Sequence, residues 1–233
     1  MSELPIVAVN YKAYPTAFGA KGLEIAKEAD RIAKEFKGSV KIVLAVPLTE
    51  IYRISSSTEE VTVYAQHADP IEPGAHTGFT PLEAIKEAGA KGVLLNHSEH
   101  KLILSDIVWL VEKAKKLNLE TMVCADNYEA AAAIAALSPS YIAVEPPELI
   151  GTGIPVSKAK PEVIVKSVEA VHRIAKIPVL AGAGITKGED VEAAIRLGSV
   201  GVLVASAVMK ASNPGAKIRE LVEAAARAWS ARK

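Results

Sequence analysis

The sequence predicts one α/β domain, a closed (β/α)8 barrel spanning residues 1–233. Eight short runs rich in apolar and β-branched residues alternate with longer segments rich in alanine and charged residues, and no Gly-, Ser- or Pro-rich linker divides the chain. The runs start near Pro5, Val40, Val61, Lys91, Leu119, Tyr141, Ile177 and Ser199. Eight right-handed βα units can close on themselves and leave no exposed sheet edge, so this pattern favours a barrel.

The predicted strands have the composition of a parallel sheet. Residues 6–9, 42–46 and 200–204 are apolar almost throughout, which is typical of strands that are buried on both faces. An open doubly wound sheet is the alternative fold. It would normally carry a glycine-rich phosphate-binding turn after its first strand, where this chain has Asn10-Tyr11-Lys12.

The segments between the strands have helical spacing and helix start signals. In residues 23–34, apolar side chains recur at helical spacing among Lys, Glu and Arg. Asn213-Pro214 and Thr80-Pro81 each place a polar cap before a proline at the first helical position. Thr186 with Glu189 predicts a capping box.

The composition gives no bulk electrostatic preference. Lys plus Arg and Asp plus Glu number 27 each, so neither nucleic-acid binding nor a membrane-surface role gains support. The single cysteine, Cys124, excludes an intramolecular disulfide and fits a reducing compartment. The sequence shows neither a signal-peptide pattern nor an apolar stretch of membrane-spanning length, and we expect a cytoplasmic protein.

In a (β/α)8 barrel, functional residues lie where strands end and the following loops begin. Asn10 and Lys12 follow the first predicted strand, and His97 follows the fourth. A helical turn starting after His97 would disfavour the imidazolium, so we expect a neutral ring that donates a hydrogen bond. Taken singly, a solvated loop lysine and a hydrogen-bonded loop histidine are the commoner interpretations.

The sixth predicted strand ends in Glu145, followed directly by Pro146-Pro147. The two prolines stiffen the chain, and the segment closes with Gly151-Thr152-Gly153. A rigid start and a glycine-rich end predict a lid over a ligand, next to a carboxylate aimed into the site. The alternative is a proline-rich surface connection with an incidental glutamate.

Small residues follow the last two predicted strands, in Ala181-Gly182-Ala183-Gly184 and Ala205-Ser206. Backbone N–H groups there can approach an anion closely, and a short helix starting near Ser206 would add its positive end. Barrels commonly bind phosphate at this position. Small residues that serve only tight packing are the alternative.

Taken together, five motifs resemble the triosephosphate isomerases in residue type, chain order and barrel position. They are Asn10-x-Lys12, Gly74-Ala75-His76-Thr77-Gly78, His97-Ser98-Glu99, Glu145-Pro146 and Gly151-Thr152-Gly153. The resemblance spans nearly the whole chain. It implies a TIM barrel that interconverts D-glyceraldehyde 3-phosphate and dihydroxyacetone phosphate through an enediolate, in glycolysis and gluconeogenesis, with no metal and no other cofactor.

The resemblance also implies the catalytic roles, and this family is itself a standard example of a base glutamate, a neutral histidine and a closing lid. Glu145 would be the base that moves the proton between C1 and C2. His97 would polarise the carbonyl and stabilise the enediolate. Lys12 would hold the charged substrate, Asn10 would assist at the carbonyl oxygen, and Glu99 would orient Lys12. The phosphate-binding residues implied in the same way are Ile150, Gly151, Gly184, Ala205 and Ser206.

Several positions depart from the pattern of bacterial and eukaryotic members. Pro-Pro-Glu-Leu at residues 146–149 replaces Pro-Val-Trp, Ala-Gly-Ala-Gly at 181–184 replaces Tyr-Gly-Gly-Ser, and His100 replaces an arginine. These versions resemble the archaeal branch. They remove the tyrosine and serine that latch the lid elsewhere in the family. Cys124 matches a family position close to the base, and we expect it to pack there.

The family consists of dimers in which the third loop enters the neighbouring subunit, which would place His76 and Thr77 at that contact. The archaeal branch resembles a pair of such dimers. We therefore expect a homotetramer, with a dimer as the alternative, and helices around the fourth and fifth βα units at the second interface.

Two other functions fit a phosphate-binding barrel. A sugar-phosphate lyase or synthase would share the phosphate site but not the combination of a Glu-Pro lid with His-Ser-Glu. A non-catalytic barrel that only binds a phosphorylated ligand would be expected to lack Glu145, Lys12 or His97, and all three are present.

Overall fold

The computed structural model describes residues 4–149, 153 and 155–232. Within these residues, eight parallel strands form a closed barrel in sequence order, with β8 paired to β1. They are β1 (Ile6–Asn10), β2 (Lys41–Val46), β3 (Thr62–Ala65), β4 (Gly92–Leu95), β5 (Glu120–Ala125), β6 (Tyr141–Val144), β7 (Val179–Gly182) and β8 (Gly201–Val204). Each strand begins within two residues of its predicted start, and the predicted (β/α)8 barrel is confirmed.

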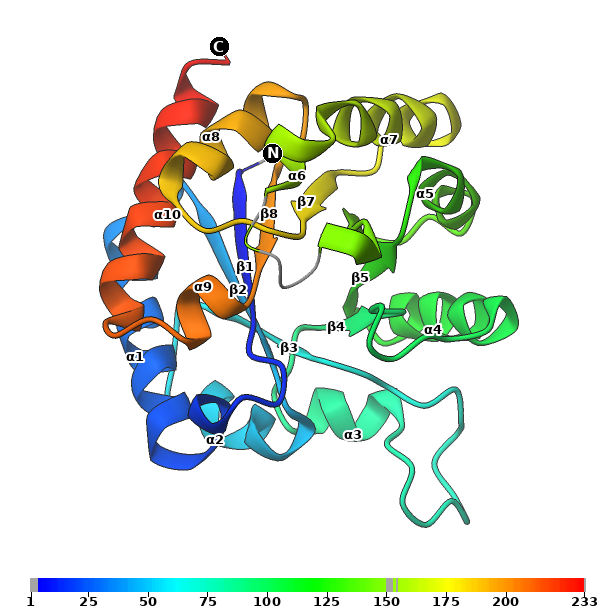
Figure 1. Ribbon diagram of the computed structural model, residues 1–233. Coiled ribbons are helices and arrows are strands. Elements are labelled where there is room, and N and C mark those ends of the chain that lie inside the picture. Colours follow the sequence, from blue (N-terminus) through cyan, green and yellow to red (C-terminus); the bar gives the residue numbers. More distant parts are fainter. Residues whose placement is uncertain (1–3, 150–152, 154, 233) are drawn as a thin grey trace.

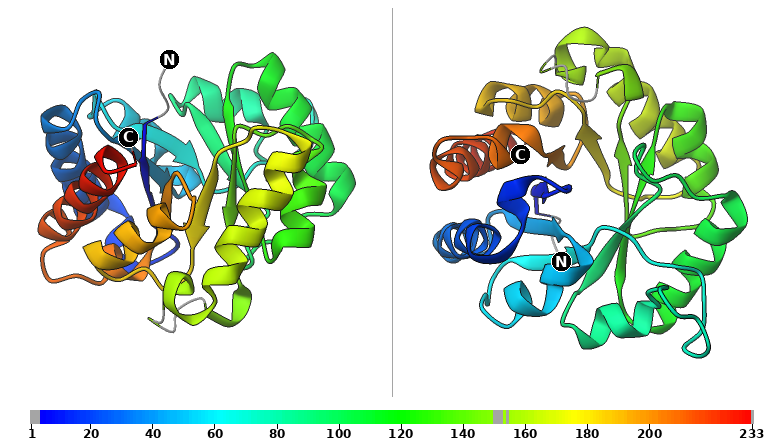
Figure 2. Two further views of the ribbon diagram at one scale, coloured as in Figure 1. Left: turned by 90° about the horizontal axis from the view of Figure 1, so that it is seen from above. Right: turned by 60° about the horizontal axis from the view of Figure 1, so that its bottom comes forward.

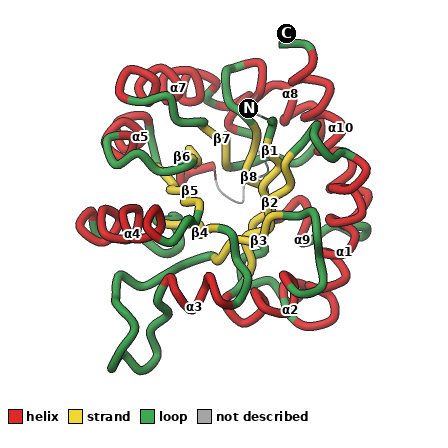
Figure 3. The backbone as a smooth tube through the Cα atoms, turned by 180° about the vertical axis from the view of Figure 1, so that it is seen from behind, coloured by secondary structure: helices red, strands yellow, loops and turns green. Residues whose placement is uncertain are grey.

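Helices surround the strands, as Figures 1 and 3 show. The longer ones are α1 (Gly19–Glu35), α4 (Leu104–Lys116), α5 (Tyr128–Ala135), α7 (Pro161–Ile174), α8 (Gly188–Arg196) and α10 (Pro214–Ser230). The shorter ones are η1 (Pro15–Ala17), η2 (Leu48–Glu50), α2 (Ile51–Ser55), α3 (Leu82–Glu87), η3 (Pro147–Leu149), α6 (Val156–Ala159) and α9 (Ser206–Met209). No helix in the described part of the chain is long and apolar enough to cross a membrane.

Two apolar layers hold the barrel together because side chains on a strand alternate between its two faces. The outward residues pack under the helices that ring the barrel in both views of Figure 2. The inward residues fill the barrel; they are Ile6, Ala8, Val43, Ala45, Tyr64, Leu94, Met122, Cys124, Ala143, Leu180 and Leu203, and Val200, just before β8, packs in the same cluster. The same alternation carried to the strand ends directs Asn10, Gln66 and Glu145 to the inside of the barrel mouth.

Of the three cap motifs predicted to start helices, at Thr80-Pro81, Thr186 with Glu189, and Asn213-Pro214, only Asn213-Pro214 is confirmed. Asn213 caps α10 by accepting a hydrogen bond from the Ala216 N–H at 2.9 Å, and Pro214 is the first helical residue. The prediction for Thr80-Pro81 is wrong, because Pro81 is itself the N-cap of α3. The Thr80 N–H instead donates to the Asp69 carboxylate at 2.6 Å, which anchors the preceding loop.

The predicted capping box of Thr186 with Glu189 is also wrong. The N-cap of α8 is Lys187, and it is the Asp190 carboxylate that turns back to the helix start. That carboxylate accepts hydrogen bonds from the Thr186 N–H at 3.1 Å and from the Thr186 hydroxyl at 2.9 Å. Asp190 is fully buried, whereas Glu189 lies on the outer side in an ion pair with Lys187, so helix phase selects the aspartate.

Candidate active site

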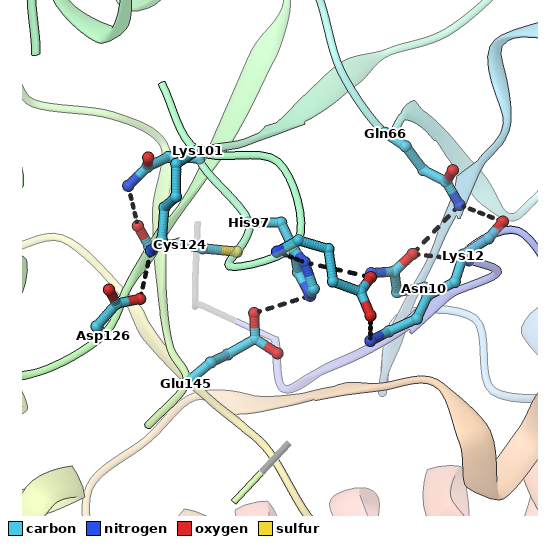
Figure 4. A network of polar contacts seen from close by, with 10 residues as sticks. Asn10, Lys12, Gln66, His97, Lys101, Cys124, Asp126 and Glu145 are labelled. Atoms are coloured by element: carbon cyan, nitrogen blue, oxygen red, sulfur yellow. Dashed lines mark hydrogen bonds and ion pairs between the residues drawn. The ribbon is translucent and has the colours of Figure 1, made fainter. Parts of the chain in front are cut away.

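The carboxyl ends of the strands bring Glu145 and His97 face to face (Figure 4). Both side chains are buried, and His97 Nε2 lies 3.4 Å from Glu145 Oε2. The contact is an ion-pair approach and lacks hydrogen-bond geometry, so among the described residues neither atom has a hydrogen-bond partner. Buried polar atoms are rarely left in this state. Two such atoms aimed at one point indicate a place where a ligand is bound.

Local backbone contacts set the orientation of the His97 ring. The Glu99 N–H donates to His97 Nδ1 at 3.1 Å, and the His100 N–H donates to the His97 carbonyl at 2.8 Å. Because Nδ1 is an acceptor, the neutral ring carries its proton on Nε2, toward Glu145. The predicted helical turn after His97 is thus a single hydrogen-bonded turn, and no helix follows it until α4 starts at Leu104.

Glu145 has room at the barrel mouth because β7 ends in a glycine. A Cβ atom at Gly182 would lie 2.2 Å from Glu145 Cγ, far inside van der Waals contact. Cys124 lies beside the same carboxylate, as predicted. Burial raises the pKa of the Cys124 thiol well above its ordinary value, and the neighbouring Glu145 charge raises it further. The thiol is therefore a neutral packing partner of the carboxylate.

Lys12 reaches the site from the first loop in an uncommon backbone conformation, with φ at 47°. The Asn10 side-chain oxygen accepts a hydrogen bond from the Lys12 N–H at 2.9 Å, which supports this turn. Lys12 Nζ contacts Glu99 Oε1 at 2.7 Å, and the Lys12 side chain is 14% exposed. A cation is thus fixed at the edge of the site by two residues that the sequence analysis had selected.

Gln66 is a site residue that the sequence analysis missed. Its amide nitrogen lies within hydrogen-bonding distance of three oxygens: Asn10 Oδ1 at 3.2 Å, the Lys12 carbonyl at 3.2 Å and the Ala45 carbonyl at 3.1 Å. It therefore supports the strained loop that carries Lys12. Gln66 follows β3 two residues after the inward-facing Tyr64, and this alternation is the signal that could have identified it.

A cavity lies between Glu145 and the loops after β7 and β8. Ala183 and Gly184 have φ values of 74° and 72°, so the chain turns sharply there. α9 starts at Ser206, as predicted. The cavity lining includes Lys12, Tyr14, Glu145, Gly153, Gly184, Ala205 and Ser206. Of the predicted phosphate-binding residues, Ile150 and Gly151 lie outside the described residues.

Tyr14 is a second lining residue that the sequence analysis missed, and the Lys210 ammonium lies 5.2 Å from the centre of its ring. In the described part of the chain, no group of three or more His, Cys, Asp or Glu side chains is arranged to hold a metal ion.

These groups form a set suited to one kind of chemistry. A carboxylate facing a ring N–H can remove a proton from a carbon next to a carbonyl while the N–H stabilises the charge that develops on oxygen. An ammonium and a cavity lined by small residues, both beside that pair, suit a substrate that carries an anionic group.

Known proteins resemble this chain over nearly its whole length. The family model described as triosephosphate isomerase matches residues 5–225. A triosephosphate isomerase of Methanocaldococcus jannaschii is 52% identical over 219 residues, covering 94% of this chain and 99% of that protein. Triosephosphate isomerases of Sulfolobus acidocaldarius and Caldivirga maquilingensis are 48% and 50% identical, covering 98% and 95% of this chain and 98% and 97% of those proteins. The chain therefore belongs to the triosephosphate isomerase family.

Proposed function

We propose that this chain interconverts D-glyceraldehyde 3-phosphate and dihydroxyacetone phosphate, with Glu145 as the base. Family membership over nearly the whole chain supports the reaction, and the facing pair of Glu145 and His97 supports the assignment of the base. The same pair argues against a barrel that only binds a phosphorylated ligand, since such a protein has no use for a buried carboxylate held opposite a ring N–H. A sugar-phosphate lyase or synthase finds no support in the family match.

In the proposed reaction, Glu145 takes the proton from the carbon next to the carbonyl. The electron pair of the broken C–H bond forms the carbon–carbon double bond of an enediolate, and the carbonyl oxygen takes the negative charge. The His97 Nε2–H donates to that oxygen, where a buried hydrogen bond stabilises charge most strongly. Protonated Glu145 then returns the proton to the other carbon, and proton transfer between the two oxygens completes the isomerisation.

Lys12 is the proposed electrostatic contact for the substrate. Its ammonium is paired with Glu99, whose side chain is 57% exposed, so an incoming dianion meets a cation whose present partner is accessible to water. Asn10 holds the Lys12 turn and lines the same cavity, which supports its proposed contact with the substrate oxygen. Glu99 is the proposed orienting partner of Lys12.

The phosphate is proposed to bind where the β7 and β8 loops meet. Gly184, Ala205 and Ser206 line the cavity there, and the absence of large side chains allows backbone N–H groups to approach an anion. Ile150 and Gly151 are proposed to complete the site from the lid. The substrate is an anion that crosses membranes poorly, which supports a cytoplasmic place in glycolysis and gluconeogenesis.

A homo-oligomer is proposed from two surfaces. The loop between β3 and α3 projects from the barrel (Figure 1), and residues 72–79 along it are exposed. Beside Lys12 runs an open groove lined in part by Phe18, Leu48, His67 and His100. A second copy whose projecting loop entered this groove would cover the 42% exposed Phe18 and bury its own 54% exposed Phe79.

The second surface supports a tetramer. Ile103 and Leu104, at the start of α4, are 67% and 60% exposed, and Tyr128 at the start of α5 is 36% exposed. Apolar side chains exposed together on neighbouring helices are typical of an interface. The double substitution Ile103→Lys with Leu104→Glu should convert tetramers to dimers in analytical ultracentrifugation. A parent protein that sediments as a dimer would contradict the tetramer.

The activity is tested by following glyceraldehyde 3-phosphate by ¹H NMR, with no added metal or nucleotide, for the parent and Glu145→Gln. The amide occupies the same space but cannot accept the proton, so kcat should fall about 10³-fold. The inhibition constant of inorganic phosphate should stay within about threefold, because the proposed phosphate contacts come from the β7 and β8 loops and not from the carboxylate. A folded but inactive parent would favour another phosphate-binding barrel enzyme. A variant as fast as the parent would show that Glu145 is not the base.

A further inference from the structure

We propose that Asn96 is a positioning residue that fixes His97 opposite the base. The inference rests on the proposed isomerase activity and adds a residue that acts through His97 and strand β5. Asn96 is the residue between the end of β4 and His97, and its side-chain amide makes one hydrogen bond at each end. The sequence analysis did not select Asn96 as a site residue.

The backbone at Asn96 is in the left-handed region, with φ at 57°. Asparagine tolerates this conformation better than most residues, but it is still more strained there than glycine. The conformation ends β4 at Leu95 and turns the chain so that the next residue, His97, enters the barrel mouth. A glycine would form the turn at lower cost, so the side chain of Asn96 needs a separate explanation.

The nitrogen of the Asn96 side-chain amide makes the next β4–β5 hydrogen bond, at the point where the β4 backbone turns away from β5. The register of β4 and β5 ends at the pair Leu95 and Val123. A hydrogen bond from the Glu120 N–H to the Lys91 carbonyl at 2.9 Å shows that alternate β5 residues, counted from 120, bond to β4. The Cys124 carbonyl is therefore the next acceptor, and Asn96 Nδ2 donates to it at 3.0 Å.

The other end of the amide closes the loop that carries His97. Asn96 Oδ1 accepts a hydrogen bond from the Leu102 N–H at 3.0 Å, which ties together the two ends of residues 96–102. That loop also contains the Glu99 N–H that holds His97 Nδ1. The amide thus connects the whole loop to β5.

We call the two hydrogen bonds of the Asn96 amide, to Cys124 and to Leu102, the Asn96 clamp. Cys124 links this clamp to the base. Its carbonyl accepts from Asn96 while its side chain lies against the Glu145 carboxylate. His97 and Glu145 are therefore both located relative to one residue of β5, and the distance of 3.4 Å between their reacting atoms depends on the Asn96 amide. Misplacement of a catalytic group by about 1 Å can cost about 10²-fold in rate.

Asn96→Gly tests the proposal, because glycine keeps the positive φ and removes both hydrogen bonds. The matched control is Asn118→Gly. Asn118 has the same φ of 57°, is exposed and lies between α4 and β5, away from the site. Asn96→Gly should lower kcat about 10- to 100-fold, with KM and the inhibition constant of inorganic phosphate within about threefold of the parent. Asn118→Gly should leave all three constants unchanged.

Asn96→Asp separates the two ends of the clamp. An aspartate keeps an acceptor for the Leu102 N–H and loses the donor to Cys124, so its kcat should fall nearly as far as that of the glycine variant. The imidazole ¹⁵N resonances of His97 should broaden or move in both Asn96 variants and stay unchanged in Asn118→Gly. A kcat for Asn96→Gly within twofold of the parent would overturn the proposal while leaving the isomerase assignment intact. An inactive parent would refute the isomerase assignment itself.

Discussion

The two ends of the barrel both contain inward-facing polar groups, but these groups are fully paired at one end and incompletely paired at the other. At the amino ends of the strands, Lys41 Nζ lies 2.7 and 2.8 Å from the two Glu120 oxygens. The Tyr64 hydroxyl donates to Glu120 at 2.6 Å, and the Tyr141 hydroxyl joins the cluster 3.2 Å from Lys41. Glu120 thus has a partner at each oxygen. We call these four residues the floor cluster.

At the carboxyl ends, the polar groups are positioned but incompletely paired. His97 Nε2 and Glu145 Oε2 face each other at 3.4 Å without a hydrogen bond, although both are buried. The groups around them are fully engaged: Nδ1 of His97 accepts from Glu99, and the Asn96 amide is bonded at both ends.

The difference indicates that the polar groups at the amino ends of the strands contribute to stability, whereas those at the carboxyl ends serve catalysis. A satisfied polar network contributes to stability because each member has its partners within the protein. An unsatisfied buried pair costs free energy, and that cost is recovered when a ligand supplies the missing partners. Substitutions in the floor cluster should therefore lower the free energy of unfolding and leave kcat nearly unchanged. Substitutions at the barrel mouth should lower kcat and have less effect on the free energy of unfolding.

Of the substitutions that compare the two ends, Gly182→Ala should give the largest effect, and it should act mainly on catalysis. The new Cβ would lie 2.2 Å from Glu145 Cγ and 2.8 Å from Cδ, so the Glu145 carboxylate must move from its position opposite His97. We expect kcat/KM to fall about 10²-fold, with a denaturation midpoint close to that of the parent. The measurement is steady-state kinetics beside urea unfolding. Loss of stability with kcat retained in the folded fraction would contradict the difference between the two ends.

Glu120→Gln should give the opposite result at the floor. The substitution leaves the Lys41 ammonium without its counter-ion and weakens the acceptor for the Tyr64 hydroxyl. Because Lys41 and Glu120 keep partial contact with water, we expect the free energy of unfolding to fall by about 1–2 kcal/mol. Isomerase kcat should stay within twofold of the parent. A tenfold loss of kcat without unfolding would show that the two ends are coupled.

Tyr64→Phe should give the smallest loss of stability at neutral pH, where it removes one hydrogen bond to Glu120, and its distinctive effect should appear in alkali. Burial raises the pKa of Tyr64 well above 10, and the neighbouring Glu120 charge raises it further. A pKa raised by folding gives stability that is fully present below the unfolded value and is lost as pH rises beyond it. Above about pH 10 the parent should therefore lose up to about 1.4 kcal/mol per pH unit relative to Tyr64→Phe. Urea unfolding of both proteins from pH 8 to 11 measures this difference, and parallel curves would exclude Tyr64 as its source.

Local sequence signals located most of the site. Short apolar strands and the polar residues directly after them made Asn10, Lys12, His97 and Glu145 candidates for one barrel mouth, because parallel strands present their carboxyl ends together. The family resemblance then assigned their roles. The same signals failed for Gly182. Its sequence context suggested an anion-binding turn, but only the neighbouring strand shows that it makes room for the base.

Helix starts show the same limit on a smaller scale. Asn213-Pro214 was predicted correctly, because a cap and its target are adjacent in the chain. At Thr186 the choice between Glu189 and Asp190 depended on which side chain the packing of α8 turned inward.

The sequence by itself determined the number and order of the strands, the parallel sheet and the chemical types at the barrel mouth, since these follow from periodicity and residue chemistry within single segments. Only the tertiary structure decided which groups meet. The floor cluster joins Lys41, Tyr64, Glu120 and Tyr141, and the Asn96 amide reaches Cys124 across the gap left by β4. Such contacts depend on the register and closure of the barrel, to which every strand contributes, so no single segment encodes them.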